Sequence, residues 1–422
     1  MTKTVLSFID CVLNDTEPPI GIDLAIRMTL PGIIAADGAT VSKIVASQAH
    51  HKKIDGHAPG LTGKELNAYV AAGVYSDHEC ADMEDALNKL KLGQFIMIRE
   101  GTAARNLEAL IDLIKSPNCF DRCMFCTDDK HPSDLLEKGH MDYICREAVR
   151  MGADPIRTVQ VATLHAARYF LMNNRGAIAP GFLADFAVVE DLTNFKVTTV
   201  YKRGKLVYGD GMVVDFPKPE IPAHLDALAH DTFHLSVLSA GDFAEPRRKA
   251  VIGMVDGQII TTDNGYAEGV DLEQDILKMA VVERHKNTRH IGIGYLQGYG
   301  MKAGAVATSV SHDSHNIICV GCSDEDMAFA CNRIAENRGG IVVVKDGQVL
   351  AELPLEIAGL MSDKPLTEVN DLLEKAKDAA YTLGVGKGID PFMTLSFMAL
   401  PVIPTLRLTT RGVVDVLTQQ YV

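Results

Sequence analysis

Long apolar stretches and runs of basic residues are both missing from this chain of 422 residues. A helix that spans a bilayer needs roughly 18 or more consecutive apolar residues, and no stretch of that length occurs. The first residues also lack the basic segment, apolar core and cleavage site of a secretory leader. We therefore expect neither a membrane span nor an exported protein.

Positive charge is scarce relative to negative charge. Lys and Arg total 41 against 55 Asp and Glu, which gives a formal net charge of −14 at pH 7. Such a surface repels the phosphates of a nucleic-acid backbone. We therefore expect a small-molecule substrate and no nucleic-acid partner.

The nine cysteines are scattered along the chain. Cys123 and Cys126 have C-x-x-C spacing, but they fall in a predicted strand, where residues three apart point to opposite faces. We therefore do not expect these two cysteines to share a metal. Scattered cysteines in apolar surroundings are typical of the reducing cytoplasm, which we predict as the location.

Short apolar runs alternate with helix-like segments in the first part of the chain. Strands are predicted near 53–57, 73–78, 95–100 and 122–128, and helices over 103–114 and 135–151, among others. This alternation indicates an α/β fold with parallel strands. Only four clear strand–helix units can be counted, whereas a closed barrel needs eight. The sequence therefore predicts a partial (β/α) barrel over residues 1–172.

Three further segments follow the predicted partial barrel. Residues 173–215 are rich in strand-forming residues and are expected to form a segment of a β-sandwich. Residues 216–248 begin with several prolines and are predicted to be a linker. Residues 249–422 contain two predicted strand pairs and capped helices, which indicates a separate C-terminal α/β domain.

Polar motifs follow three of the predicted strands. They read D-G-H-A-P-G at Asp55–Gly60, S-D-H-E at Ser76–Glu79 and C-T-D-D at Cys126–Asp129. The carboxyl ends of parallel strands meet on one side of a (β/α) barrel, where such proteins place their chemistry. The three motifs are therefore expected to lie close together.

The spacing of the ligand-type residues agrees with this placement. His57 and His78 are 21 residues apart, about one strand–helix unit, and His78 and Asp128 are 50 apart, about two units. Each histidine taken singly is more simply a hydrogen-bonded loop residue. Taken together at matching strand ends, His57, His78 and Asp128 predict a divalent metal site.

Longer stretches around these motifs resemble one family. The sequences D-G-H-A-P-G-L-T-G-K-E-L-N-A-Y from Asp55, I-R-E-G-T-A-A-R-N-L from Ile98 and C-T-D-D-K-H-P from Cys126 are similar to those of bacterial adenine deaminases, in the amidohydrolase superfamily. The likeness extends from about Met28 to the C-terminus. It includes H-D-S-H-N at His312–Asn316, G-L-M-S-D from residue 359 and D-P-F-M-T-L-S-F from residue 390.

The resemblance implies a hydrolase of purine salvage that deaminates free adenine to hypoxanthine and ammonia. It makes His57 and His78 ligands of manganese or iron, and Asp128 both a ligand and the base for the attacking hydroxide. A divalent metal lowers the pKa of bound water from about 15.7 to roughly 7, so hydroxide is available at neutral pH. Glu79 and Asp129 would carry the proton to the leaving nitrogen, although the helix dipole alone also favours acids at a helix start.

Substrate-binding residues are implied in both halves of the chain. Arg99 and Glu100 would read the base, or would simply pair with each other. His312, Asp313 and His315 form a polar loop by themselves, and the resemblance implies that they close the purine pocket. We expect no metal on His312 and His315, since only a helix would point residues three apart together.

The sequence also departs from the family pattern. The superfamily carries an H-x-H pair on its first strand, and no H-x-H occurs in these 422 residues. Ile26 stands where adenine deaminases have a metal-bridging glutamate. The chain is thus expected to lack the N-terminal third of the family.

Three hypotheses follow from these departures. The chain is an active adenine deaminase that tolerates the loss, an inactive truncated member or structural fragment, or an amidohydrolase that acts on another heterocyclic ring. A partial barrel leaves unpaired strand edges, and both these edges and the family resemblance favour a homo-oligomer.

Overall fold

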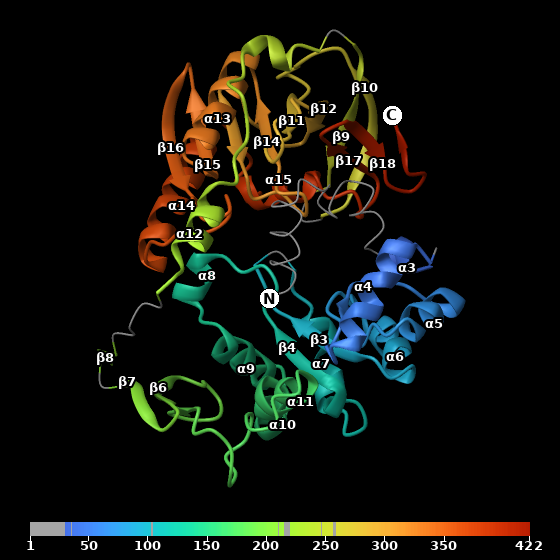
Figure 1. The fold of residues 1–422 in the computed structure, drawn as a ribbon, viewed down its shortest axis with the longest axis vertical. Helices are drawn as coiled ribbons and strands as arrows, with labels where there is room; N and C mark the ends of the chain where they lie inside the picture. The colour runs from blue at the N-terminus through green and yellow to red at the C-terminus, as the bar shows by residue number, and fades with distance from the viewer. Residues whose placement is uncertain are drawn as a thin grey trace. The chain divides into compact units, whose positions relative to one another are not determined.

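The fold is described from a computed structural model, in which residues 30–34, 36–102, 104–209, 211–214, 220–245, 247–255 and 259–422 are described. Ile26 lies outside these residues. The described residues form two compact units, one between Arg27 and Pro219 and one between Glu220 and Val422 (Figure 1). Both units mix helices with sheets, so the predicted α/β class is confirmed.

A four-stranded parallel sheet organises the first unit. Its strands lie in chain order: β1 (Asp55–Gly56), β2 (Ser76–Asp77), β3 (Phe95–Arg99) and β4 (Cys123–Cys126). Among the described residues, two helices precede the sheet and one helix follows each strand: α3 (Leu30–Ile34), α4 (Gly38–Ala49), α5 (Gly63–Ala71), α6 (Met83–Lys91), α7 (Leu107–Lys115) and α8 (Pro132–Glu137). Because the strands are parallel, the loops after β1 to β4 all leave the same edge of the sheet.

Apolar side chains from β3, β4, α7 and α9 (Met141–Arg150) form the core beneath these loops. Ile96 and Ile98 of β3 are fully buried and pack with Leu110 and Leu113 of α7 and Ile144 of α9. The strands are short, but burial on this scale holds them in place, since each fully buried aliphatic side chain contributes about 1.5–3 kcal/mol.

Two predicted helices of this unit differ from the structure. The helix expected over 103–114 begins at Leu107, because Arg105 forms a β-bridge with Glu100 instead. The helix expected over 135–151 is divided into α8 and α9 around Gly139, whose φ of 103° is incompatible with a continuous right-handed helix.

The rest of the first unit contains a helical stretch and a second sheet. Asp154 caps α10 (Pro155–Gln160), and the helix continues through a π-helical turn (Val161–His165) into α11 (Ala166–Tyr169). Four antiparallel strands then form a sheet of their own: β5 (Phe186–Val189), β6 (Val197–Lys202), β7 (Lys205–Gly209) and β8 (Met212–Val213).

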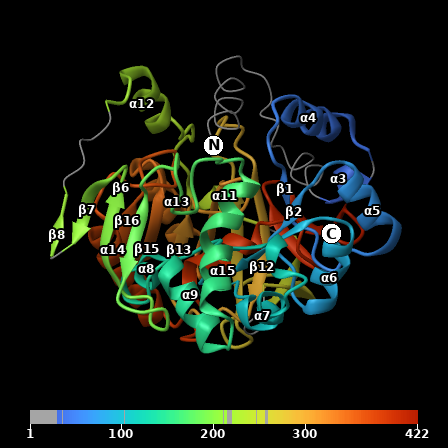
Figure 2. The ribbon, with the colours of Figure 1, turned by 90° about the horizontal axis from the view of Figure 1, so that it is seen from below.

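An eight-stranded sheet is the centre of the second unit; Figure 1 labels seven of its strands, and Figure 2 also labels β13. The order is β10-β9-β12-β11-β14-β13-β15-β16, with only the β9–β12 pair parallel. The strands are β9 (Lys249–Met254), β10 (Thr261–Ala267), β11 (Ile276–Val282), β12 (Ile291–Gln297), β13 (Ala305–Thr308), β14 (Ile317–Gly321), β15 (Gly340–Lys345) and β16 (Gln348–Pro354).

Helices cover both faces of this sheet. Alternate residues of β14 show the two faces, because Ile318 belongs to one apolar cluster and Cys319 to another. The first cluster receives α14 (Leu366–Thr382) and α15 (Pro391–Met398), and the second receives α13 (Asp324–Glu336). A small antiparallel sheet completes the unit: β17 (Leu406–Thr409), β18 (Gly412–Asp415) and β19 (Gln420–Tyr421).

The stretch suggested as a linker, residues 216–248, contributes ordered structure to the second unit. It contains α12 (Ala223–His230) and a 3-10 turn (Ala240–Phe243). Leu238 and Phe243 are buried in the apolar cluster beside α13. Within the described ranges, no helix has both the length and the apolar character of a membrane span.

Candidate metal centre

Three potential metal ligands meet at the carboxyl edge of the parallel sheet. His57 follows β1 directly, and His78 and Glu79 follow β2. One ligand atom from each of these residues lies within 4.8 Å of the other two. The rings of His57 and His78 are 5.4 Å apart between centroids. The sheet therefore brings the imidazole of His57 together with the imidazole and carboxylate of the neighbouring residues His78 and Glu79.

A glycine allows this edge to close. The residue before His57 is Gly56, and a Cβ atom there would lie 1.9 Å from the hydroxyl of Tyr69 and 2.6 Å from Val74. Any side chain would push the strand end away from α5. Gly56 pairs with Asp77 in register, so this close packing also sets the position of His57 along the strand direction relative to His78.

Asp55 orients the ring of His78. Its Oδ2 lies 2.9 Å from Nδ1 of His78, and its Oδ1 accepts a hydrogen bond of 2.6 Å from Ser76 Oγ. The Ser76 hydroxyl is also 2.6 Å from the hydroxyl of Tyr169. When Nδ1–H donates to Asp55, Nε2 of His78 carries the lone pair that a metal requires.

The pKa values in this chain of contacts follow from burial and charge. Burial is the largest single effect and opposes the charge of both Asp55 and His78, but their mutual hydrogen bond, their opposite charges and further neighbouring groups together outweigh it. The pKa of His78 is therefore raised and the pKa of Asp55 lowered. Burial raises the pKa of Tyr169 to about 12, so its hydroxyl stays protonated.

Arg99 connects the ends of β2 and β4. Its Nη1 lies 2.6 Å from Oδ2 of Asp128 and 3.1 Å from Oε1 of Glu79. Its Nε donates to Asn106 Oδ1 at 3.0 Å, which fixes the plane of the guanidinium. The Arg99 residue is largely buried, so these ion pairs are partly shielded from water.

The sequence-predicted residues of the first unit thus lie together at one edge. The third donor close to His57 and His78 is Glu79, while the Asp128 carboxylate is paired with Arg99. The role of Asp128 as a metal ligand stays a prediction. Two alternatives were predicted for Arg99, namely contact with the substrate base or pairing with Glu100. Its described ion pairs favour neither, since they are with Glu79 and Asp128.

Glu100 and Asp129 occupy the same region. Glu100 is largely buried, and burial raises the pKa of its carboxyl. The main-chain oxygen of Asp129 accepts a hydrogen bond of 2.9 Å from Thr102 N, which ties the loop after β4 to the loop after β3. The binding of the substrate base by Glu100 and the transfer of a proton by Asp129 both remain predictions.

The ligand chemistry fits a divalent metal. Two imidazoles with one carboxylate are a donor set used by zinc and by non-haem iron, and carboxylates also suit manganese. The bond between His78 and Asp55 matches the outer partner that a metal-bound histidine usually has.

Sequence reasoning missed three residues that support this edge, namely Asp55, Asp77 and Lys89. The two aspartates lie within the motifs that supply the histidines, and that proximity was the available signal. Lys89 lies on α6, eleven residues beyond His78, and nothing in its local sequence indicates a buried position.

His312, Asp313 and His315 belong to the second unit, in the loop before β14. Two residues just after β11 hold this loop: Arg284 Nε donates to the His315 carbonyl at 2.6 Å, and His285 Nε2 lies 2.8 Å from the Ser314 carbonyl. The ring of His312 lies 5.0 Å from that of Phe397 in α15. These interactions describe a well-anchored polar loop.

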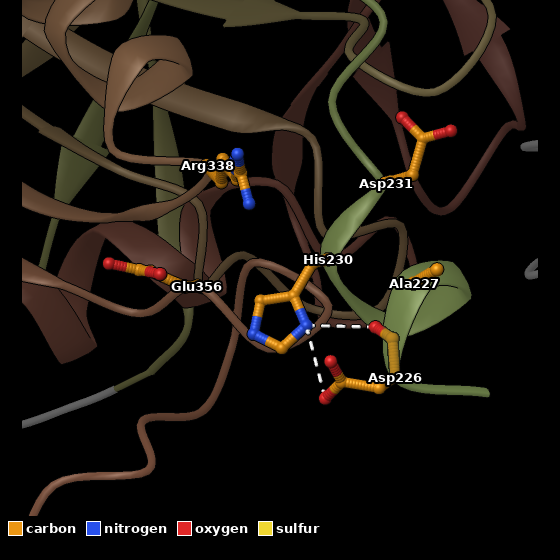
Figure 3. Close-up of a pocket in the computed structure, with 6 residues that line it drawn as sticks. All are labelled: Asp226, Ala227, His230, Asp231, Arg338 and Glu356. Atoms are coloured by element: carbon orange, nitrogen blue, oxygen red, sulfur yellow. Dashed lines mark hydrogen bonds and ion pairs between the residues drawn. The ribbon is translucent and has the colours of Figure 1, made fainter. Parts of the chain in front are cut away.

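A polar cavity of about 620 Å³ also lies in the second unit, at the end of α12 (Figure 3). In that view His230 lies between Asp226 and Glu356, with Nδ1 2.8 Å from the Asp226 carbonyl. Its lining consists of Asp226, Ala227, His230, Asp231, Arg338 and Glu356. None of the sequence-predicted site residues is among them.

Two family descriptions match this chain. Residues 31–207 match the amidohydrolase family, and residues 256–420 match the adenine deaminase C-terminal domain. The first match contains the four parallel strands with their edge of histidines, and the second contains most of the eight-stranded sheet.

Curated relatives match over nearly the whole chain. An adenine deaminase of Desulfatibacillum aliphaticivorans is 44% identical over 98% of this chain and 72% of its own length. An adenine deaminase of Nitratidesulfovibrio vulgaris (strain DP4) is 43% identical over 95% of this chain and 71% of its own length. Among solved structures, a β-aspartyl dipeptidase of Fervidobacterium islandicum AW-1 is 20% identical over 44% of this chain and 54% of its own, with a TM-score of 0.36.

Proposed function

We infer the reaction from one premise: this chain belongs to the adenine deaminase family. The proposed reaction is the hydrolytic deamination of free adenine to hypoxanthine and ammonia. The observation that carries it is the group formed by His57, His78 and Glu79 at adjoining strand ends, with ligand atoms within 4.8 Å of one another. The bond from Asp55 to His78 supports the same conclusion, because it presents the other ring nitrogen to a metal.

His57, His78 and Glu79 would hold the metal, for which we propose manganese or iron, and Asp128 remains a proposed further ligand. A divalent metal bound there would supply a water that ionises near neutral pH. Asp128 is proposed as the base that accepts the proton of this water. Arg99 holds the Asp128 carboxylate in place through an ion pair of 2.6 Å.

Proton delivery to the leaving nitrogen is proposed for Asp129, which follows the proposed base Asp128 in sequence, and for the carboxylate oxygen of Glu79 that would not be bound to the metal. Arg99 and Glu100 are proposed to contact the base. A role for His312, Asp313 and His315 in binding adenine is also a proposal, and the resemblance of their motif supports it.

We also propose the wider setting of the reaction. The four parallel strands are part of a (β/α) barrel, and the chain is a cytoplasmic enzyme of purine salvage. Among the described strands, β1 and β4 each have one partner in the parallel sheet, which favours a homo-oligomer.

A non-catalytic family member is the competing proposal. The missing H-x-H pair favours it, as does Ile26 at the position of the bridging glutamate. Nothing specific favours another heterocyclic substrate. The two remaining proposals differ in whether His57, His78 and Glu79 suffice to hold a working metal.

The test is metal content together with ammonia release from adenine on the purified chain, with and without added manganese. We expect bound metal and turnover in the unaltered chain, and at least a tenfold loss of metal affinity with no measurable turnover in His57→Ala. His224→Ala, an exposed histidine on α12, serves as the control and should change neither. A folded chain without metal or ammonia would establish the non-catalytic alternative.

A further inference from the structure

Asp77 is a fully buried carboxylate beside the candidate metal ligands, yet it is not one of them. Its Oδ1 accepts a hydrogen bond of 2.7 Å from the backbone N–H of Glu79, directly after His78. Its Oδ2 accepts a bond of 2.9 Å from the backbone N–H of Ala58, directly after His57. One side chain therefore connects the two loops that supply the metal ligands.

The charge of Asp77 is balanced from α6. The Nζ of Lys89, also fully buried, lies 2.9 Å from Asp77 Oδ2 and 2.9 Å from Asp85 Oδ1. Asp85 in turn accepts a hydrogen bond of 3.3 Å from Gly60 N, farther along the loop after β1. A buried ammonium paired with two carboxylates is costly to separate, so the three groups hold one another in fixed positions.

We propose that Asp77, balanced by Lys89, is a positioning residue that fixes the separation of His57 and His78 and thereby sets the metal affinity of the site. The proposal rests on the proposed function only in assuming that a metal binds these histidines. The physical reason is that two hydrogen bonds from one rigid carboxylate, each to the residue directly after a histidine, lock the relative register of the two loops.

The chemistry of a carboxylate matters for this role. Asp77 uses both oxygens as acceptors, one for each loop. The amide of Asn has a single acceptor and places an NH₂ donor opposite the other backbone N–H. Asp77→Asn must therefore release one of the two loops, whichever way its side chain turns.

Asp85 offers a matched control. Asp85→Asn also removes one of the two carboxylates around Lys89, and Asp85 is almost as buried as Asp77. Its bond reaches Gly60 and neither of the residues that directly follow a histidine ligand. A purely structural role would make the two variants alike, whereas positioning makes Asp77→Asn the more damaging for metal binding.

The experiment is a titration of the metal-free chain with manganese at a temperature below the unfolding temperature of each variant. The electron paramagnetic resonance signal of free manganese measures how much of the ion remains unbound at each step. We expect about a 10- to 100-fold weaker affinity in Asp77→Asn and less than a tenfold change in Asp85→Asn. Thermal unfolding of the metal-free proteins shows whether the two variants lose similar stability. Equal affinities of Asp77→Asn and Asp85→Asn, or of Asp77→Asn and the unaltered chain, overturn the proposal.

A second variant covers the case in which Asp77→Asn does not fold. Asp77→Glu keeps the charge next to Lys89 but moves both oxygens by one methylene, so we expect weakened manganese binding in a folded protein. Unaltered affinity in Asp77→Glu overturns the proposal. Manganese binding by the unaltered chain without ammonia release overturns only the proposed deamination, whereas the absence of manganese binding overturns both.

Discussion

His78 shows how much of this site depends on single side chains. Asp55 holds one ring nitrogen, and the charges of Asp55, Glu79 and Asp128 together raise the pKa of the ring against the opposing effect of burial. The same negative charges that attract a cation also favour a proton on His78. A metal bound at His78 would therefore compete with a proton for this ring, as metals do at histidine sites generally.

His285 provides a residue-scale test of pH dependence in the second unit. Burial and the neighbouring charge of Arg284 lower the pKa of His285 to about 4, from an ordinary 6.5. Between these values the unfolded chain binds a proton that the folded chain excludes, so stability falls as the pH drops from about 6.5 toward about 4. Because the ring is only partly buried, we expect a loss of about 1–2 kcal/mol rather than the full ~3.

The measurement is urea unfolding of the second unit at pH 7, 5.5 and 4.5, compared with His285→Gln. Gln cannot titrate, and its amide N–H can still donate to the Ser314 carbonyl that His285 contacts. The difference in stability between the two proteins should shrink or reverse as the pH falls. A difference that does not depend on pH would contradict the prediction.

At the scale of elements, α6 links secondary structure to the site. Asp82 caps the helix by accepting a hydrogen bond of 2.9 Å from Asp85 N. Acids in its first turn and lysines in its last turn also match the helix dipole. The helix carries both Lys89 and Asp85, so its first turn helps to hold the buried charges that contact Asp77, next to the candidate metal ligands.

Asp82→Ala should lower the free energy of unfolding by about 1 kcal/mol, because the Asp85 amide loses its acceptor. Urea unfolding of the metal-free chain measures this loss. Asp82→Asn keeps a capping oxygen and should remain within a few tenths of a kcal/mol of the unaltered chain. Equal destabilisation by both changes would show that the charge of Asp82, and not its hydrogen bond, is responsible.

At the scale of the whole molecule, the chain has two compact units with separate cores. All three residues of the candidate metal site belong to the first unit. A ligand that binds only the folded form stabilises the part of the protein that it binds. Metal should therefore affect the two units differently.

We expect two unfolding transitions in differential scanning calorimetry, of which manganese raises only one. At a hundredfold excess over Kd the added stability is about 2.7 kcal/mol, which corresponds to roughly 5–10 °C for a unit of this size. His57→Ala should abolish the shift and thereby assign the transition to the first unit. A single transition, or a shift that persists in His57→Ala, would contradict this expectation.

The sequence by itself determined the local structural features and the family to which the chain belongs. The cap at Asp154 before Pro155, the turn at Asp346-Gly347 between β15 and β16, and the limits of α6 are all decided by neighbours within a few residues. The long motifs around His57 and Asp128 were sufficient to predict the family. They keep the residue sequence that is typical of the family's site, and this sequence is recognisable without knowledge of which residues contact one another in the fold.

Only the tertiary structure decided how the site is held together. The third donor next to the histidines is Glu79, the Asp128 carboxylate is paired with Arg99, and Lys89 lies buried against Asp77. The last two contacts join residues from different strands and helices, and their free energy depends on burial that no local pattern specifies. The division between α8 and α9 was missed at Gly139 because the apolar spacing continues across a residue whose backbone does not.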